Sequence, residues 1–344
     1  MYRFECDYAE GCHPLIMDAL FKTNSEQHCG YGNDIYCEKA RKAILDLCDC
    51  KTCAVHFLVG GTQTNTVVIN HILRPHQGVL CANTGHITIH ETGAIEATGH
   101  KVLPLDSDDG TITGKQVLDY CSAHFSDHDF EHIVQPGMVY ISNPTENGTI
   151  YTKSQLSELK KACEQYSIPL FIDGARLGYA LASPKNDLTL SDLCKLCDVF
   201  YIGGTKVGAL FGEAVVITST ALQKDFRYIM KQHGAMLAKG RLLGVQFLTL
   251  FTDNLYTDIS KNAVELALQI KQAFASVGCE FLFDSYTNQQ FPILSDSQLE
   301  ILSKKYSYSF WKKMPDGKNA VRFCTSWATP DTAVKELISD IKAL

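Results

Sequence analysis

Short apolar runs recur along the first two thirds of the chain, and most are apolar at nearly every position rather than at every second one. Runs of four or five residues with this pattern and many β-branched side chains are typical of strands buried on both faces of a sheet. Helix-like stretches separate most of them, including Thr62–Leu73 and Ser154–Tyr166, with Ser154 as the expected cap. The seven predicted strands are Val55–Val59, Val79–Asn83, Lys101–Leu105, Met138–Ser142, Pro169–Ile172, Asp198–Ile202 and Glu213–Ile217.

This alternation of strands and helices predicts an α/β domain with a mostly parallel sheet. The pattern changes after about residue 218: residues 219–275 are mostly helical, with a break at Asp253-Asn254, and shorter segments follow before a final helix from Asp331. We therefore expect a smaller C-terminal α+β domain. The predicted divisions are a large domain over 21–245, a small domain over 246–344, and an N-terminal segment, 1–20, that packs against the small domain or a neighbouring subunit.

Composition and charge narrow the class of protein. The 344 residues carry 31 basic and 38 acidic side chains, a net charge of −7, which argues against a broad nucleic-acid surface. The N-terminus lacks the apolar core of a signal peptide, and no uncharged apolar run reaches the ~18 residues of a membrane helix. We expect a cytoplasmic protein with no membrane partner, and a small anionic ligand remains compatible with this balance.

The chain has 14 cysteines, and two groups stand out: Cys48-x-Cys50-x-x-Cys53 and Cys194-x-x-Cys197. Disulfide-dense proteins are usually short, so the length argues against a disulfide scaffold. A zinc site would have to join the two groups, and neither has the usual finger spacing. Cysteine often serves as a small buried hydrophobe, so we expect no metal ligand here, and a redox role for Cys194 and Cys197 is no better supported.

Two candidate features lie in the first half of the predicted sheet. Gly60-Gly61-Thr62 follows a strand and opens a helix, where free N–H groups and the helix dipole can hold an anion. It matches neither common glycine-rich nucleotide motif, and a simple turn is the alternative. His86 follows the next strand at its carboxyl end, where open α/β sheets bind ligands, although a structural histidine is the alternative.

Two more features lie in the second half. Asp173 ends an apolar strand and begins Asp173-Gly174-Ala175-Arg176; it can pair with a cationic ring nitrogen or simply cap the next helix. Lys206 follows Gly203-Gly204-Thr205, where a desolvated amine can act as a nucleophile, unless it is a surface lysine. An anion cradle, a stacking ring, an aspartate and a lysine are together the parts of a pyridoxal phosphate site.

The chain resembles the L-threonine aldolases, which belong to the β-eliminating lyase group of fold type I pyridoxal phosphate enzymes, related to aspartate aminotransferase. The resemblance covers nearly the whole chain and implies a large domain with a seven-stranded sheet plus the small C-terminal domain. The matching segments are Tyr31-Gly32-Asn33-Asp34, Gly61-Thr62-x-x-Asn65, His86 through Gly99, Asp173-Gly174-Ala175-Arg176 and Val321–Thr325.

The resemblance implies roles for individual residues. Lys206 would hold the cofactor as a Schiff base, Asp173 would pair with its ring nitrogen and His86 would stack on the ring. Candidates for the other roles are Gly60, Gly61, Thr62 and Thr205 for the phosphate, Arg176 for substrate carboxylate or cofactor oxygens, Arg322 and Tyr31 for the substrate, and His132 near the substrate hydroxyl.

Two departures from the family pattern bear on these roles. The lysine motif is Thr205-Lys206-Val207-Gly208 instead of S-K-G-L. Ala238 stands where the family often has an arginine that reaches a neighbouring subunit's phosphate, so Lys231 and Lys239 are the remaining candidates.

The implied activity is cleavage of threonine and related β-hydroxy amino acids to glycine and an aldehyde, with His86 or His132 as the base. The resemblance also implies a homotetramer arranged as a dimer of dimers. A β-eliminating lyase or an aminotransferase would use the same cofactor residues and stays open. A nucleotide-binding α/β protein and a non-catalytic or metal-binding interaction protein are further alternatives.

Overall fold

The computed structural model describes residues 1–344 and contains a seven-stranded sheet in the order β2-β8-β7-β6-β5-β3-β4. Only β8 runs antiparallel to its neighbours, so the predicted α/β class with a mostly parallel sheet is confirmed. The strands are β2 (Ala54–Leu58), β3 (Gln77–Ala82), β4 (Lys101–Leu105), β5 (Gln135–Ser142), β6 (Leu170–Asp173), β7 (Val199–Gly203) and β8 (Glu213–Ile217).

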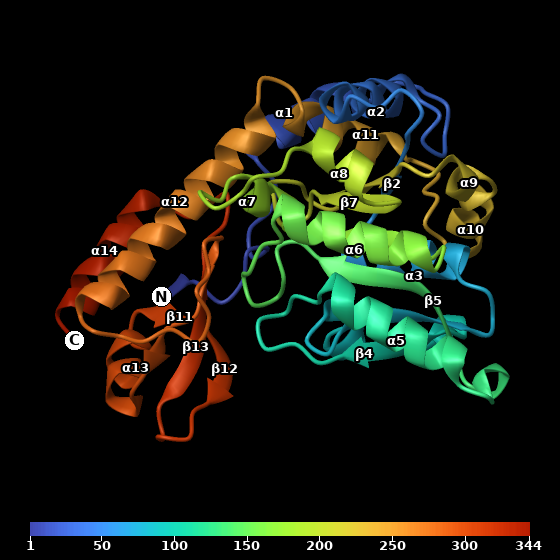
Figure 1. The fold of residues 1–344 in the computed structure, drawn as a ribbon. Coiled ribbons are helices and arrows are strands. Elements are labelled where there is room, and N and C mark those ends of the chain that lie inside the picture. The colour runs from blue at the N-terminus through green and yellow to red at the C-terminus, as the bar shows by residue number, and fades with distance from the viewer.

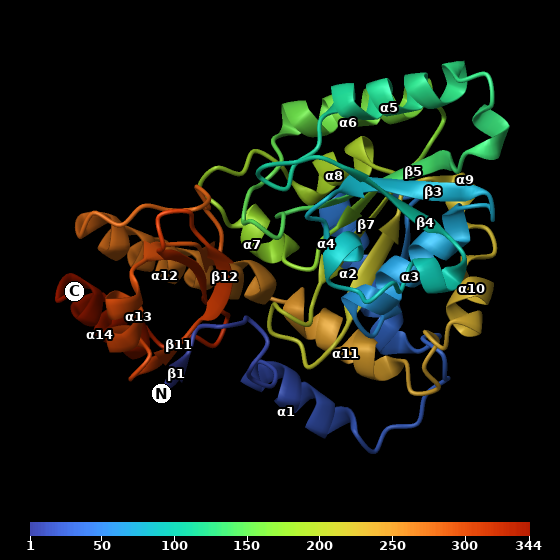
Figure 2. The same cartoon turned by 90° about the horizontal axis from the view of Figure 1, so that it is seen from below.

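Helices cover both faces of this sheet, which is why its strands are apolar on both sides. One face packs against α2 (Ile35–Cys48), α5 (Gly114–Ser126), α6 (Lys153–Gln165) and α8 (Leu190–Leu196). The other packs against α3 (Gly61–Ile72) and α10 (Phe226–Gln232). Figure 2 shows α5 and α6 on one side of the sheet and α3 and α10 on the other.

A second lobe with its own apolar core lies beside the large sheet, at the left of Figure 1. Its small antiparallel sheet packs with two helices that run side by side, α12 and α14. The elements are α12 (Leu255–Ser276), β9 (Gln289–Gln290), β10 (Ile293–Leu294), α13 (Asp296–Leu302), β11 (Tyr306–Ser307), β12 (Ser309–Lys313), β13 (Asn319–Cys324) and α14 (Asp331–Lys342).

The N-terminal residues connect the two lobes. Strand β1 (Tyr2–Arg3) pairs with β11 of the second lobe, whereas α1 (Pro14–Thr23) packs on α11 (Arg241–Leu250) beside α2. The predicted divisions at residues 20 and 245 stay predictions. The remaining short elements are α4 (His86–Ile89), η1 (Glu96–Thr98), η2 (Phe130–His132), α7 (Leu177–Leu181) and α9 (Thr220–Gln223).

The sequence predicted the ends of the helices and strands closely, with one correction to a helix cap. Asp253 and Asn254 adopt positive φ angles of 50° and 60° and separate α11 from α12, as the predicted helix break requires. The cap of α6 is Thr152 rather than Ser154, because the Thr152 hydroxyl accepts from Gln155 N and the Gln155 side chain accepts from Thr152 N. No helix combines the length and apolar character needed to cross a bilayer.

Candidate active site

The chemically important residues gather where the strand order of the large sheet reverses. From β3 the chain crosses to β4 on one side and then returns to β5 on the other side of β3. Loops that leave the carboxyl ends of such neighbouring strands part in opposite directions and open a crevice between them. His86 follows β3 and Glu146 follows β5, so these two side chains flank the crevice.

A cavity of about 300 Å³ occupies this crevice and opens beside a second one of about 620 Å³ between the lobes. Tyr8, His86, Glu146, Arg176 and Lys206 contribute to the walls of both. The inner cavity therefore leads into an outer one that also contacts the second lobe. The predicted residues that line the inner cavity are Gly61, Thr62, His86, Asp173, Arg176, Thr205 and Lys206.

Asp173 is the buried acid at the base of the inner cavity. Its Oδ1 accepts from the Tyr201 hydroxyl at 2.5 Å and Ala175 N at 2.9 Å. Its Oδ2 accepts from the Tyr140 hydroxyl at 2.5 Å and Asn65 Nδ2 at 3.1 Å. Burial and the Asp173 charge raise the pKa of both tyrosines, so their hydroxyls remain donors to this carboxylate.

The turn after Asp173 needs a glycine at its second position. A Cβ atom on Gly174 would lie 1.8 Å from the Tyr201 carbonyl oxygen, a distance that no side chain can occupy. The close approach lets Ala175 form part of the cavity wall and directs Arg176 toward the second lobe. The Asp-Gly-Ala-Arg segment is therefore shaped by packing against β7 as well as by chemistry.

Arg176 is already paired with a carboxylate from the N-terminal segment. Its Nε and Nη2 donate to the two oxygens of Asp7 at 2.6 and 3.0 Å, and Asn288 Nδ2 donates to Asp7 Oδ2 at 2.9 Å. Burial alone would raise the pKa of Asp7, but the charges of Arg176 and Lys206 and these hydrogen bonds lower it from 3.8 to about 2. Asp7 thus links both lobes at the cavity wall.

We expect the Asp7→Ala variant to lose about 3–5 kcal/mol of unfolding free energy at pH 7, because it leaves the buried Arg176 cation without its partner. Since the folded pKa of Asp7 is depressed, its contribution is complete above about pH 4 and is lost as the pH falls toward 2. Urea denaturation at pH 7 and pH 3 measures both effects.

The matched control for that measurement is Asp18→Ala, which breaks the exposed pair with Lys22 on α1. Exposed pairs of this spacing contribute only about 0.3–0.5 kcal/mol. An Asp7 variant no less stable than the Asp18 variant would contradict the structural role of the Asp7–Arg176 pair.

Lys206 lies in the turn after β7, at the junction of the two cavities. Burial, and secondly the nearby Arg176 charge, lower the pKa of its amine, which favours the neutral, nucleophilic form. The Tyr179 hydroxyl donates to the Lys206 carbonyl at 2.6 Å and holds the turn in place. The Lys206 Nζ lies 5.9 Å from the centroid of the Tyr8 ring.

His86 opens α4 and is fixed by a buried acid. Its Nδ1 donates to Glu91 Oε1 at 2.7 Å, and the same oxygen accepts from Asn65 Nδ2 at 2.8 Å. Burial lowers the pKa of His86, but the Glu91 hydrogen bond and the Asp173 charge outweigh it and raise the pKa above its ordinary value. Glu91 thus fixes the orientation of the His86 ring at the wall of the inner cavity.

The anion-binding end of the inner cavity is the N-terminus of α3. Gly60 is its cap residue, and Gly61 and Thr62 line the cavity. Across from them, the Thr205 hydroxyl donates to Glu213 Oε1 at 2.8 Å. Burial raises the pKa of Glu213 to about 8, so this carboxyl is mostly neutral at pH 7 and does not repel an anion.

Glu146 is a cavity residue that the sequence analysis missed. Its Oε1 accepts from the Ser142 hydroxyl at 2.8 Å, and it contributes to the walls of both cavities. Burial, and secondly the Asp173 charge, raise the pKa of this carboxyl. A signal was available, because Glu146 stands in the loop directly after the predicted strand 138–142, at the ligand-binding edge.

Arg322 projects from β13 of the second lobe into the outer cavity. Its guanidinium donates to Gln289 Oε1 at 3.0 Å and to the Glu5 carbonyl at 2.8 Å, and lies 5.4 Å from the Trp311 ring centroid. No carboxylate pairs with it, and its buried Nε has no partner. The Arg176 guanidinium is paired with Asp7, whereas the Arg322 guanidinium is free to bind an incoming anion.

Four predicted residues are not brought to these cavities. His132 is exposed on η2, before the amino end of β5, whereas the cavity lies beyond its carboxyl end, roughly 25 Å away for an eight-residue strand. The structure thus corrects the assignment of His132.

The other three residues lie on another part of the surface. The Lys231 Nζ lies 4.7 Å from the centroid of the Tyr31 ring, and Lys239 is exposed. A contact of Lys231 or Lys239 with a neighbouring subunit's phosphate, and a substrate role for Tyr31, stay predictions.

The sequence of the chain matches a known protein family and curated relatives. Residues 7–297 match the model of a family described as beta-eliminating lyase. A low specificity L-threonine aldolase from a Pseudomonas species is 29% identical, over 99% of this chain and 97% of the relative.

Solved structures agree with this match. The structure of a Leishmania major threonine aldolase is 41% identical, with a TM-score of 0.97, over 100% of this chain and 99% of that one. A structure described as SPT with PLP has a TM-score of 0.72 over 99% of this chain and 86% of that one; at 11% identity it shows the shared fold alone.

Proposed function

The chain belongs to the beta-eliminating lyase family, among its threonine aldolases, and from this premise we propose that it cleaves L-threonine and L-allo-threonine. The products are glycine and acetaldehyde, and related β-hydroxy amino acids give glycine and the corresponding aldehyde. The observation that carries the proposal is the paired cavity, in which Lys206 and Asp173 lie inside and the unpaired Arg322 lies at the entrance.

The family and its fold neighbours imply pyridoxal phosphate as the cofactor, and the residues present fit it. The inner cavity offers an amine with a lowered pKa, a buried carboxylate and a helix N-terminus. Two buried oxygens beside it, Asn65 Oδ1 and Glu91 Oε2, have no hydrogen-bond partner. An arrangement of this kind is expected where a polar ligand completes the hydrogen bonding.

Each of these groups has a proposed role. Lys206 holds the cofactor as a Schiff base, Asp173 pairs with its ring nitrogen, and His86 packs on the ring. The residues that hold the phosphate are Gly60, Gly61, Thr62 and Thr205. When bound, pyridoxal phosphate supplies an electron sink for the pair of electrons that the broken Cα–Cβ bond leaves behind.

Asp173 must exchange one hydrogen bond to bind a ring nitrogen. A carboxylate has about four lone-pair sites, and Asp173 already accepts from four donors. Asn65 makes the longest of these bonds, at 3.1 Å, and also donates to Glu91. We therefore propose that Asn65 is the donor that yields, while Tyr140 and Tyr201 keep the carboxylate oriented.

We propose that Glu146, rather than His86 or His132, is the base that accepts the proton of the substrate β-hydroxyl. The carboxyl lies in the wall shared by both cavities, as does Lys206, and Arg322 lines the outer one. The raised pKa of this carboxyl makes it a stronger base than an exposed carboxylate. The Nδ1 of His86 is already engaged by Glu91, which fits a role in ring packing.

Arg322 is proposed to bind the substrate carboxylate. We expect Arg322→Lys to raise the KM for threonine about 10–100-fold with a smaller change in kcat, since a bidentate hydrogen-bonded charge becomes a single ammonium. Initial rates over a range of threonine concentrations measure the split. The exposed Arg74→Lys change serves as the control, and an unaltered KM in the Arg322 variant would rule out this role.

The activity itself is tested with the purified, cofactor-loaded protein and L-threonine. We expect glycine and acetaldehyde in equal amounts, measured by amino-acid analysis and by a coupled alcohol dehydrogenase assay. Formation of 2-oxobutanoate and ammonia would instead identify β-elimination. A requirement for an oxo acid as amino acceptor would identify transamination.

The substrate is thus a small amino acid, and we further propose a cytoplasmic homotetramer. The exposed side chains of Phe21 and Tyr228, 81% and 77% accessible, support assembly, because large apolar groups on a surface often mark subunit contacts. Light scattering tests the tetramer against the 38.2 kDa of one chain.

A further inference from the structure

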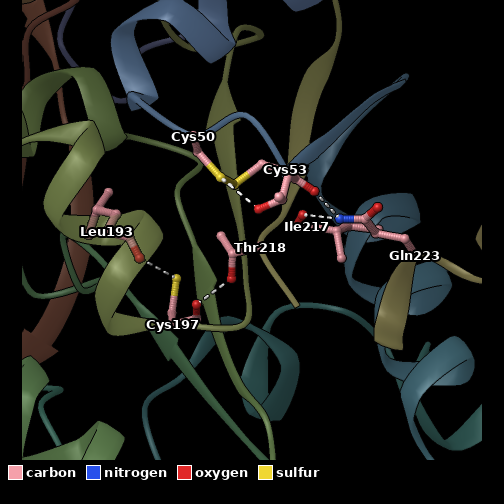
Figure 3. The surroundings of a disulfide bond; sticks show 8 residues. Cys50, Cys53, Leu193, Cys197, Ile217, Thr218 and Gln223 are labelled. Carbon is pink, nitrogen blue, oxygen red and sulfur yellow. Dashed lines mark hydrogen bonds between the residues drawn. A yellow bond between two sulfur atoms is a disulfide. The ribbon is translucent and has the colours of Figure 1, made fainter. Parts of the chain in front are cut away.

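Both cysteine groups of the sequence meet at one place, away from the cavities. Cys48 ends α2, Cys50 and Cys53 lie in the turn that leads into β2, and Cys194 lies on α8. The sulfur atoms of Cys50, Cys53 and Cys194 all lie within 4.8 Å of one another. Figure 3 shows Cys50 and Cys53 facing each other at the start of β2.

Cys48 adds a fourth sulfur to this group. It is fully buried, and its thiol contacts that of Cys194. Cys197 is not a member, because its Sγ donates to the Leu193 carbonyl at 3.1 Å, as Figure 3 shows.

We propose that the reduced chain binds one zinc ion through Cys48, Cys50, Cys53 and Cys194. Four thiolates around zinc, with Zn–S bonds of about 2.3 Å, lie roughly 3.8 Å from one another, and three of the sulfurs here, those of Cys50, Cys53 and Cys194, lie within 4.8 Å of one another. An all-sulfur set selects zinc or another soft ion over magnesium or calcium. The Cys-x-x-Cys pair supplies two adjacent ligands from one turn.

The disulfide between Cys50 and Cys53 is the oxidised alternative of the same site. A newly made chain carries thiols, so zinc binding needs no electron transfer: each ligand releases its thiol proton to solvent as its sulfur binds the metal. A disulfide removes two of the four ligands. Zinc and the Cys50–Cys53 bond therefore exclude each other.

The expected role of this site is structural. Four protein ligands leave no open position for a substrate or water. The cluster stands at the amino end of β2, whereas the α3 N-terminus and the inner cavity lie beyond its carboxyl end. The ion would tie α2, β2 and α8 together, and this inference does not depend on the proposed threonine cleavage.

The test is the zinc content of the full-length protein, purified under reducing conditions from cells grown with zinc and measured by mass spectrometry of the metal. We expect about one zinc per chain in the unaltered protein and a loss of at least about five-fold in Cys194→Ser. The matched control is Cys279→Ser, a similarly half-buried cysteine in the second lobe, which should keep its zinc.

Cys50→Ser provides a second variant if Cys194→Ser does not fold, because Cys50 lies in a half-exposed turn. Replacing zinc with Co²⁺ should also give thiolate-to-cobalt absorption in the unaltered protein and not in these variants. An unaltered protein that takes up no zinc when reduced, or a folded Cys194 or Cys50 variant with full zinc content, would overturn the proposal. A stable Cys50–Cys53 disulfide under the same reducing conditions would overturn it as well.

Discussion

Replacing Lys206 with alanine should lower kcat/KM for threonine by at least about 10⁴-fold, the scale seen when a catalytic nucleophile is removed. The reason is that Lys206 is the amine at the junction of the two cavities and has a lowered pKa. Acetaldehyde formation measures the loss. A second readout is independent of turnover: borohydride reduction should attach the cofactor to Lys206 in the unaltered protein and to no lysine in the variant.

Lys160→Ala is the control for the Lys206 variant. Lys160, on α6, is also partly buried, but it pairs with Asp198 at 2.9 Å, away from the cavities. Its loss should affect stability and leave turnover and cofactor attachment in place. A Lys206 variant that still cleaves threonine, or cofactor trapped on a different lysine, would show that the covalent role lies elsewhere.

Glu146→Gln should lower kcat for threonine by about 10²–10⁴-fold, the usual contribution of a general base, with a smaller effect on KM. The amide keeps the shape of the side chain and its contact with Ser142 but cannot accept the hydroxyl proton. Because the folded pKa of Glu146 is raised above 4.5, activity of the unaltered protein should fall as the pH drops through that raised value. This acid limb should disappear in the variant.

Two comparisons separate the role of Glu146 from the proposed activity as a whole. Exchange of the α-protons of glycine with deuterated water does not involve a β-hydroxyl, so it should survive in Glu146→Gln and be lost in Lys206→Ala. His132→Gln should change kcat less than about two-fold, because His132 is exposed away from the cavity. If Glu146→Gln cleaved threonine with an unaltered kcat, His86 would be the base instead.

The positions of Asp173 and Lys206 were predictable because they depend on local order along the chain. Each follows an apolar strand, and the carboxyl ends of parallel strands meet at one edge of a sheet, whatever the rest of the fold contributes. The same holds for Gly61 and Thr62, which begin the helix after β2. The family resemblance added their roles and Arg322, which lies on a separate lobe.

The partners of those residues were not predictable from spacing. Arg176 was expected to bind the substrate carboxylate or cofactor oxygens, yet Asp7, which precedes it by 169 residues, pairs with its guanidinium. Glu146 and His132 both lie near β5 in the sequence, and only the direction of that strand decides which end meets the cavity. The pKa shifts of Glu213, His86 and Lys206 come from burial and from charges carried on other elements.

The sequence by itself thus determined the strands, the class of sheet and the residues at the strand ends, because hydrophobic periodicity and local turns are properties of neighbouring residues. Tertiary packing alone decided that Asp7 pairs with Arg176, that Glu146 lines both cavities, and that Cys50, Cys53 and Cys194 lie together. Those contacts join residues far apart in the chain. Their distances follow from how helices and lobes pack, which no local pattern encodes.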